Sequence, residues 1–170
     1  ERSKRWPLTM PVLIERETWF VVAVEAGPIR RLARKGSKMR ALQDADEERQ
    51  GRRPDHSRQC VRKVLESLRQ RVGDAAITML TDKKGSYATL VRGVFGDAAR
   101  HETTAGKNPR TTYNPLFPIN TTLAMTRDNN GRLRRLSWLV TKLCECLLRQ
   151  TAIFTVYRNY VRQRFNRDPR

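Results

Sequence analysis

Asp82 is the carboxylate whose position in the sequence suits it best to contact a ligand or take part in catalysis. Asp82 closely follows an apolar run, residues 75–80 (AAITML), and precedes a turn and an amphipathic stretch, residues 87–95. A short apolar run bounded by turn residues and followed by helical spacing predicts a buried strand that leads into a helix. Because ligands of open α/β sheets bind beyond the carboxyl ends of the strands, Asp82 is well placed to contact one. The alternative is that Asp82 caps the following helix or tightens the turn.

Positive charge is the strongest global feature of the sequence. The 170 residues include 35 Lys and Arg against 17 Asp and Glu, which gives a net charge of +18 and a pI near 11.1. Self-repulsion of this size is normally tolerated when a polyanion relieves it. Arg outnumbers Lys, and its planar fork matches phosphate oxygens, which favours a nucleic-acid backbone over a membrane surface. The alternative is an ordinary solvated basic surface. The cations expected around Asp82 are Lys83, Lys84, Lys107, Arg110, Arg127, Arg132, Arg135 and Lys142.

Length and patterning indicate a single soluble domain. No apolar run is long enough to span a bilayer, and the first residues lack the apolar core of a signal peptide. We expect residues 1–113 to form an α/β core and residues 114–170 to form the C-terminal helical part of the same domain. Residues 29–54 are dominated by charge and have few apolar residues, so we expect a mobile, exposed excursion with at most a short helix through Met39 and Leu42.

The spacing of apolar residues predicts the order of the elements. Residues 8–14 and 18–24 form an antiparallel hairpin, a helix begins near residue 57, and the strand and helix around Asp82 follow. A short strand at residues 98–104 and a basic loop at 105–113 come next. After residue 114 the chain forms long helices that break near 129–131 and 137–138. This is the element order of a ribonuclease H-like domain, an α/β fold with a mixed sheet flanked by helices and long C-terminal helices. By fold-level analogy, its polynucleotide chemistry uses clustered carboxylates that hold two divalent ions.

Four segments carry a more specific resemblance. They are residues 81–87 (TDKKGSY), 114–128 (NPLFPINTTLAMTRD), 132–138 (RLRRLSW) with Thr141 and Lys142, and 157–161 (YRNYV). In this order and spacing they resemble the catalytic domain of bacterial insertion-sequence transposases of the acidic-triad (DDE) type, in the ribonuclease H-like and integrase superfamily. The resemblance implies DNA cleavage and strand transfer with Mg²⁺ or Mn²⁺, DNA as the partner, a homo-oligomer, and a location in the bacterial cytoplasm at the nucleoid.

The resemblance also assigns the acidic residues. Asp82 matches the second metal-binding carboxylate of the family. In similar proteins the first carboxylate lies a few residues before the segment that matches residues 1–4, so it is outside this chain. At the third position Asn120 stands where related elements carry Glu, and Asp128, about two helical turns further on, is the nearest carboxylate that can substitute. The catalytic and metal-binding candidates are therefore Asp82 and Asp128.

This incomplete acid set predicts a loss of activity. One secure carboxylate does not hold two Mg²⁺ ions in register, and nearby Arg further disfavours a cation. We expect a transposase fragment that is weakly active or inactive and that retains salt-sensitive DNA binding. One alternative is a non-catalytic basic nucleic-acid-binding α/β module in which Asp82 is structural. Another is a subunit of a ribonucleoprotein particle, which would prefer structured RNA. Tyr113 and Trp138 either stack on bases or belong to the core.

Overall fold

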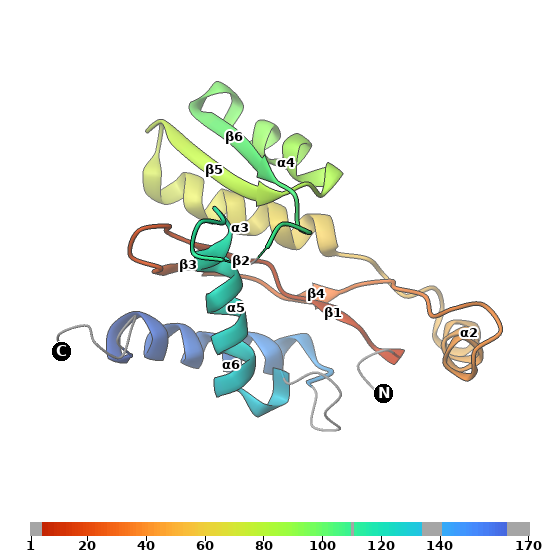
Figure 1. Ribbon diagram of the computed structural model, residues 1–170. Coiled ribbons are helices and arrows are strands. Elements are labelled where there is room, and N and C mark those ends of the chain that lie inside the picture. Colours follow the sequence, from red (N-terminus) through yellow and green to blue (C-terminus); the bar gives the residue numbers. More distant parts are fainter. Residues whose placement is uncertain (1–4, 110, 134–140, 163–170) are drawn as a thin grey trace.

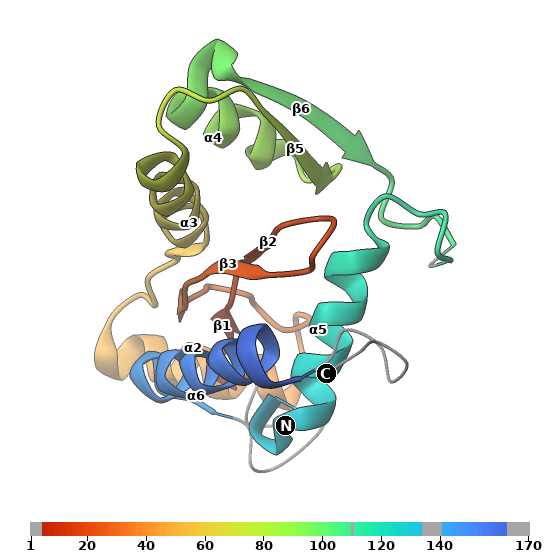
Figure 2. The same ribbon diagram turned by 90° about the vertical axis from the view of Figure 1, so that its left-hand side faces the viewer.

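The chain begins with strands, continues through two helices into a strand–helix–strand unit and ends in further helices, which is a mixed α/β arrangement (Figure 1). The structure is a computed structural model that describes residues 5–109, 111–133 and 141–162. The elements discussed below are β1 (Leu8–Thr9), β2 (Val12–Ile14), β3 (Val21–Val24), β4 (Gly27–Pro28), α2 (Lys38–Gln50), α3 (Ser57–Val72), β5 (Ile77–Asp82), α4 (Gly85–Phe95), β6 (Ala99–Thr104), α5 (Phe117–Asn129) and α6 (Cys144–Val156). The strands β1 to β4 lie in the middle of the molecule, between the unit that contains β5 and β6 and the helices α5 and α6 (Figures 1 and 2).

Residues 8–28 form a long antiparallel hairpin. β2 pairs with β3 in the register Val12↔Val24 and Leu13↔Ala23, and β1 pairs with β4 further along the same two chain segments. Both inner strands are rich in β-branched residues, which pack well on a pleated surface. Pro11 lies between β1 and β2, where the missing N–H interrupts no ladder hydrogen bond within a strand. The hairpin predicted from the sequence is confirmed.

The turn between β2 and β3 places Trp19 in the core. Trp19 has a φ of 61°, a backbone conformation that bulky side chains rarely adopt. The Glu15 carboxylate closes this turn, because it accepts hydrogen bonds from the backbone N–H groups of Glu17 (2.8 Å) and Thr18 (2.6 Å). The buried Trp19 ring packs edge-on against Phe117 of α5, with 5.8 Å between the ring centroids. This contact joins the hairpin turn to the start of α5.

β5, α4 and β6 form a parallel strand–helix–strand unit that α3 covers. The two strands pair from Ile77↔Ala99 to Asp82↔Thr104. Amphipathic spacing along α3 and α4 directs their apolar faces onto β5. The buried residues of this core are Leu65, Met79, Val91 and Phe95. The predicted helix near residue 57, the strand and helix around Asp82 and the short strand at 98–104 are confirmed, with bounds that differ by a few residues.

The C-terminal helices pack against the hairpin. α5 ends at Asn129, inside the predicted break at residues 129–131. α6 buries Leu147 and Phe154 and continues into a π-helical turn, Tyr157–Val161. The predicted break at 137–138 and most of the basic tail lie outside the described residues. Within the part of the chain that the structure describes, no helix has the length and apolar character needed to cross a membrane.

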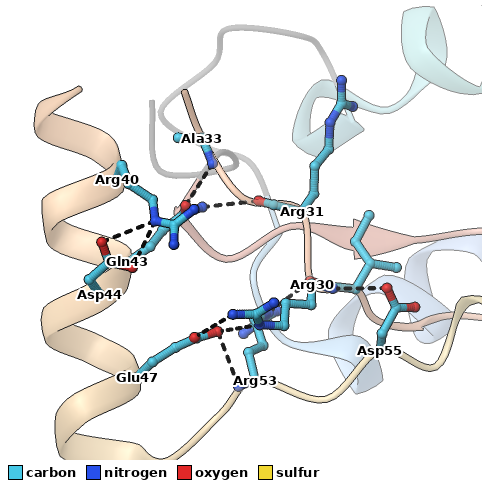
Figure 3. Close-up of polar contacts among 10 residues, drawn as sticks. Arg30, Arg31, Ala33, Arg40, Gln43, Asp44, Glu47, Arg53 and Asp55 are labelled. Atoms are coloured by element: carbon cyan, nitrogen blue, oxygen red, sulfur yellow. Dashed lines mark hydrogen bonds and ion pairs between the residues drawn. The ribbon is translucent and has the colours of Figure 1, made fainter. Parts of the chain in front are cut away.

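The charged excursion at residues 29–54 contains more structure than its composition predicts. Residues 38–50 form α2, whose first turn is capped by Ser37 through a hydrogen bond from the N–H of Arg40 (3.2 Å). The prediction that this segment has at most a short helix was wrong, because α2 extends over residues 38–50. α2 has no wide apolar stripe, and it is held by polar contacts of buried and half-buried side chains, including that of Gln43 (Figure 3).

The described strands form three two-stranded sheets, β1–β4, β2–β3 and β5–β6. The α/β class predicted from the sequence is confirmed. The single mixed sheet expected with it is not formed among the described residues, because β2 and β5 each pair on one edge only.

Candidate functional site

Asp82 lies where the carboxyl ends of the two parallel strands meet. It is the last residue of β5 and stands opposite Thr104, the last residue of β6. The loop after β6 passes close by, since a Cβ added to Gly106 would lie 4.0 Å from the Cβ of Asp82. Ligands bind at this end of parallel strands because the following loops gather there and leave a crevice. The sequence-based position of Asp82 at a strand end is confirmed.

The Asp82 carboxylate is exposed and makes one local hydrogen bond. Its Oδ1 accepts from the backbone N–H of Lys84 at 3.1 Å, which tightens the turn into α4. Lys84 is the capping residue of α4, and no side-chain hydrogen bond caps this helix. The turn-tightening contact expected as the alternative role of Asp82 is therefore present. It leaves Oδ2 without a hydrogen-bond partner among the described residues, so this oxygen can contact a ligand.

A histidine and a threonine that the sequence analysis did not select support the backbone of Asp82. The Thr81 Oγ1 hydroxyl donates to the carbonyl oxygen of Asp82 at 2.9 Å and lies 2.8 Å from His101 Nε2. Because the hydroxyl has a single proton, His101 Nε2 must be the donor in the second contact. Sequence alone does not reveal this pair, since Thr81 and His101 are 20 positions apart and are brought together only by the parallel pairing of β5 and β6.

Tyr87 places a neutral hydroxyl-bearing ring near Asp82. Burial raises the pKa of the Tyr87 phenol above its normal value, and the negative charge of Asp82 raises it further. The ammonium of Lys84 lies 5.3 Å from the centroid of the Tyr87 ring. An ammonium over an aromatic face is held there by the ring quadrupole. Tyr87 therefore stays protonated at neutral pH, and its ring holds the ammonium of Lys84.

One cavity connects Asp82 with α5 and the hairpin. Its volume is about 330 Å³, and its walls come from β2 with the residues before it, β5, α3, α4, the loop after β6 and α5. Asn120 of α5 lines this cavity together with Asp82 and Tyr87. Asp128 is exposed, lies about two turns further along α5 and is not one of the lining residues. The structure thus brings Asp82 together with Asn120, the residue at the third acid position of the resemblance.

The predicted cations fall into three groups. Lys83, Lys84 and Lys107 are exposed and surround Asp82, the first two directly after it and the third next to Gly106. Arg127, Arg132 and Lys142 belong to the far end of α5 and the residues beyond it, away from the Asp82 cavity; Arg132 is exposed and the other two are half-buried. Arg110 and Arg135, like Trp138, lie outside the described residues. Tyr113 is 94% exposed and so is not a core residue.

The donor set at the site is small. Among the described residues, no three side chains of His, Cys, Asp or Glu gather closely enough to hold a metal ion. The Asp82 carboxylate and the Asn120 amide line one cavity, which provides oxygen donors of the kind that Mg²⁺ prefers but too few for two ions. The three surrounding lysines suit phosphate oxygens. Comparisons with models of known protein families, with curated proteins and with solved structures find no match for this chain.

Proposed function

We propose that this chain is a DNA-binding part of a transposase catalytic domain of the acidic-triad type, with little or no strand-transfer activity by itself. The observation that carries the proposal is the shared cavity of Asp82 and Asn120, the two residues that the sequence resemblance places at the second and third acid positions. Lys83, Lys84 and Lys107 around the carboxylate add the positive charge that a DNA backbone needs. The position of Asp82 at the ends of parallel strands supports the same role.

Within the α/β class, we propose that this chain has a ribonuclease H-like sheet that lacks one central strand. β2 pairs only with β3, and β5 pairs only with β6, so each has an edge without a strand partner among the described residues. Both strands line the Asp82 cavity and a neighbouring apolar cavity of about 440 Å³. An extended strand placed between them would join the antiparallel hairpin and the parallel pair into one mixed sheet. The first carboxylate of the triad would then arrive on this strand, from outside the described residues.

The acid set explains the expected loss of activity. In phosphodiester chemistry, a pair of bound divalent ions stabilises the attacking and the leaving oxygen. Asp82 and the amide oxygen of Asn120 are the described groups that would hold Mg²⁺ or Mn²⁺, whereas Asp128, the carboxylate predicted to substitute for the third acid, does not line their cavity. An amide oxygen has no charge to offset that of a divalent ion, so the binding of even one ion would be weak.

Binding of Mn²⁺ tests the role of Asp82. We expect weak binding, detected by electron paramagnetic resonance of the free ion, that is lost in Asp82→Asn. The matched control is Asp97→Asn, an exposed aspartate just before the amino end of β6, which should bind Mn²⁺ as the unchanged chain does. Equal Mn²⁺ binding by the unchanged chain and Asp82→Asn would contradict the proposal. Efficient joining of DNA strands by the chain in Mg²⁺ would contradict its inactivity.

A second candidate is a non-catalytic basic nucleic-acid-binding module. The observation that favours it is the hydrogen bond from the N–H of Lys84 to the Asp82 carboxylate, which gives Asp82 a structural role in the turn. In this case Asp82→Ala, which removes the acceptor of this hydrogen bond, would lower the stability and leave nucleic-acid binding unchanged. If Mn²⁺ changes DNA binding neither in the unchanged chain nor in Asp82→Asn, this second function is favoured.

A further inference from the structure

Residues 29–56, called the arm below, are anchored to the hairpin by arginine–carboxylate pairs. Arg5, which precedes β1, donates to both oxygens of Asp46 on α2 at 2.6 and 2.5 Å. Arg30 donates to both oxygens of Glu47 at 2.8 and 2.9 Å. Two-pronged pairs of this kind have fixed geometry and are stronger than single contacts. These pairs hold α2 against the end of the hairpin at which the chain enters β1 and leaves β4.

Backbone contacts complete the anchoring of the arm. The buried side chain of Gln43 accepts from the N–H of Ala33 at 2.8 Å and donates to the carbonyl of Arg31 at 3.1 Å. Arg53 donates to the carbonyls of Ile29 (3.1 Å) and Pro7 (2.9 Å). Figure 3 shows the contacts of Gln43 and Glu47 gathered on one face of α2, while the guanidinium of Arg31 extends away from them. The arm is thus a defined structure whose backbone is held against the hairpin.

Ion pairs neutralise three of the five acids of the arm and leave an excess of positive charge. The arm contains nine Lys and Arg against five Asp and Glu. The acids Asp44, Asp46 and Glu47 are paired with Arg40, Arg5 and Arg30, and the guanidinium hydrogen bonds hold the pKa of Asp46 and of Glu47 below the normal values. The exposed cations of the arm that have no ion pair within the described part of the chain are Arg31, Arg34, Lys35, Lys38 and Arg52. This surface is therefore strongly positive.

The base of the arm adjoins the loop that follows Asp82. Asp55, at the end of the arm, has a lowered pKa, mainly from its hydrogen bonds with Ser57 and in small part from the positive charge of Lys84. Lys84 also directly precedes α4, which packs against α3, the helix that follows the arm. In Figure 1 the carboxyl end of β5 points toward the right-hand side of the molecule, where the amino end of α3 and the whole of α2 lie. The cations of the arm and those around Asp82 can therefore contact one extended polyanion.

We infer that the arm is a second binding surface for the backbone of duplex DNA, which continues the basic surface around Asp82. The inference deepens the proposed function, since it rests on DNA as the partner and names where the flanking duplex binds. Guanidinium and ammonium groups neutralise phosphates and release condensed counterions, so their contribution to affinity is independent of base sequence and depends on salt. The predominance of Arg suits phosphodiester oxygens. Rigid anchoring lowers the cost of ordering these side chains when DNA binds.

A charge-matched pair of variants tests the inference. The arm variant changes Arg31, Arg34, Lys35 and Lys38 to Gln, none of which anchors the arm through its side chain. The control variant changes four exposed cations outside the arm to Gln: Arg16, Lys63, Arg92 and Arg100. Both variants lose the same net charge. Binding of a 30-base-pair duplex is measured by fluorescence anisotropy between 50 and 200 mM salt, and folding is checked by circular dichroism.

The arm variant should bind more weakly, and the slope of log K against log[salt] should become shallower by about 3 to 4. The control variant should retain most of the slope. An equal loss of DNA affinity in the two variants would overturn the inference, because it would show an effect of net charge alone. Absence of duplex binding by the unchanged chain would instead overturn the proposed function. If the slope of the arm variant is unchanged while Lys83→Gln with Lys84→Gln lowers it, only the inference about the arm fails.

Hydrogen exchange gives an independent measurement on the unchanged chain. Addition of duplex DNA should slow amide exchange in residues 31–38 and around Lys84, because both segments would lie under the phosphate backbone. The exposed residues 73–76, at the opposite end of β5, should exchange at the same rate with and without DNA. Protection around Lys84 without protection of residues 31–38 would overturn the inference. Stronger protection by structured RNA than by duplex DNA would do so as well, since it would assign the arm to RNA.

Discussion

Asn159 pairs with the backbone of Val21 in both directions, across 138 residues of sequence. The N–H of Val21 donates to Asn159 Oδ1 at 2.8 Å, and Asn159 Nδ2 donates to the carbonyl of Val21 at 3.0 Å. A side-chain amide here takes the place of a neighbouring strand at the start of β3, whose first residue is only 2% exposed. This contact ties the C-terminal helical segment to the hairpin and gives Asn159, within the segment YRNYV, a structural role.

Replacement of Asn159 by Ala should destabilise the protein by about 2 to 4 kcal/mol, because both buried backbone groups of Val21 lose their partner. The change is measured as the shift in the urea midpoint of unfolding. The control is Asn108→Ala, whose exposed side chain makes no hydrogen bond among the described residues and which should cost less than about 0.5 kcal/mol. Equal stabilities of the two variants would contradict a structural role for Asn159.

Gly27→Ala should also destabilise the fold. A Cβ at residue 27 would lie 2.5 Å from Sγ of the buried Cys60 and 3.2 Å from Cβ of His56, so an overpacking cost of about 1 to 3 kcal/mol is expected. Cys60→Ala removes the closer atom and should recover part of this cost in the double variant, which a double-mutant cycle measures. Gly93→Ala is the control, because nothing lies within 4 Å of its added Cβ in α4. It should stabilise by about 0.5 to 1 kcal/mol.

The attachment of α2 should depend on pH. The guanidinium partners lower the pKa of Asp46 below its normal 3.8 and that of Glu47 below its normal 4.5. Because the folded-state pKa values are depressed, the stabilising contribution is complete above the normal values and is lost as the pH falls below them. Amide exchange of residues 38–50, corrected for the intrinsic rate, should therefore accelerate relative to α3 between pH 6 and pH 3.5. In Glu47→Gln this acceleration should be smaller, since one of the two titrating pairs is absent.

His101 should be held in one tautomer. Thr81 Oγ1 donates its proton to the Asp82 carbonyl, so neutral His101 must bear hydrogen on Nε2. Nitrogen-15 chemical shifts of the neutral His101 ring should show this form. Thr81→Val removes the acceptor and should lower the population of that tautomer, whereas Thr78→Val, an exposed position on the same strand, should leave it unchanged. A His101 with hydrogen on Nδ1 in the unchanged chain would contradict the contact.

The sequence alone was sufficient for the type and order of most elements. Alternating and helical apolar spacings are local signals, and they predicted the hairpin, α3, the β5–α4–β6 unit and α5 correctly. The same signals placed Asp82 at the end of a strand, because an apolar run followed by turn residues is typical of a strand that ends at the turn. They failed at α2, whose stability comes from Arg5 and Arg30 rather than from an apolar face.

Tertiary structure decided what these elements bring together. The rotation and direction of α5 place Asn120, and not Asp128, in the cavity with Asp82. The path of the chain sets Arg5 beside Asp46, and Asn159 beside Val21, although no periodic pattern links these residues. Apolar periodicity reports which face of an element is buried, while the partner of that face depends on contacts distant in sequence. For this reason the sequence determined the elements and the charge of this protein, and the three-dimensional packing decided which side chains share a site.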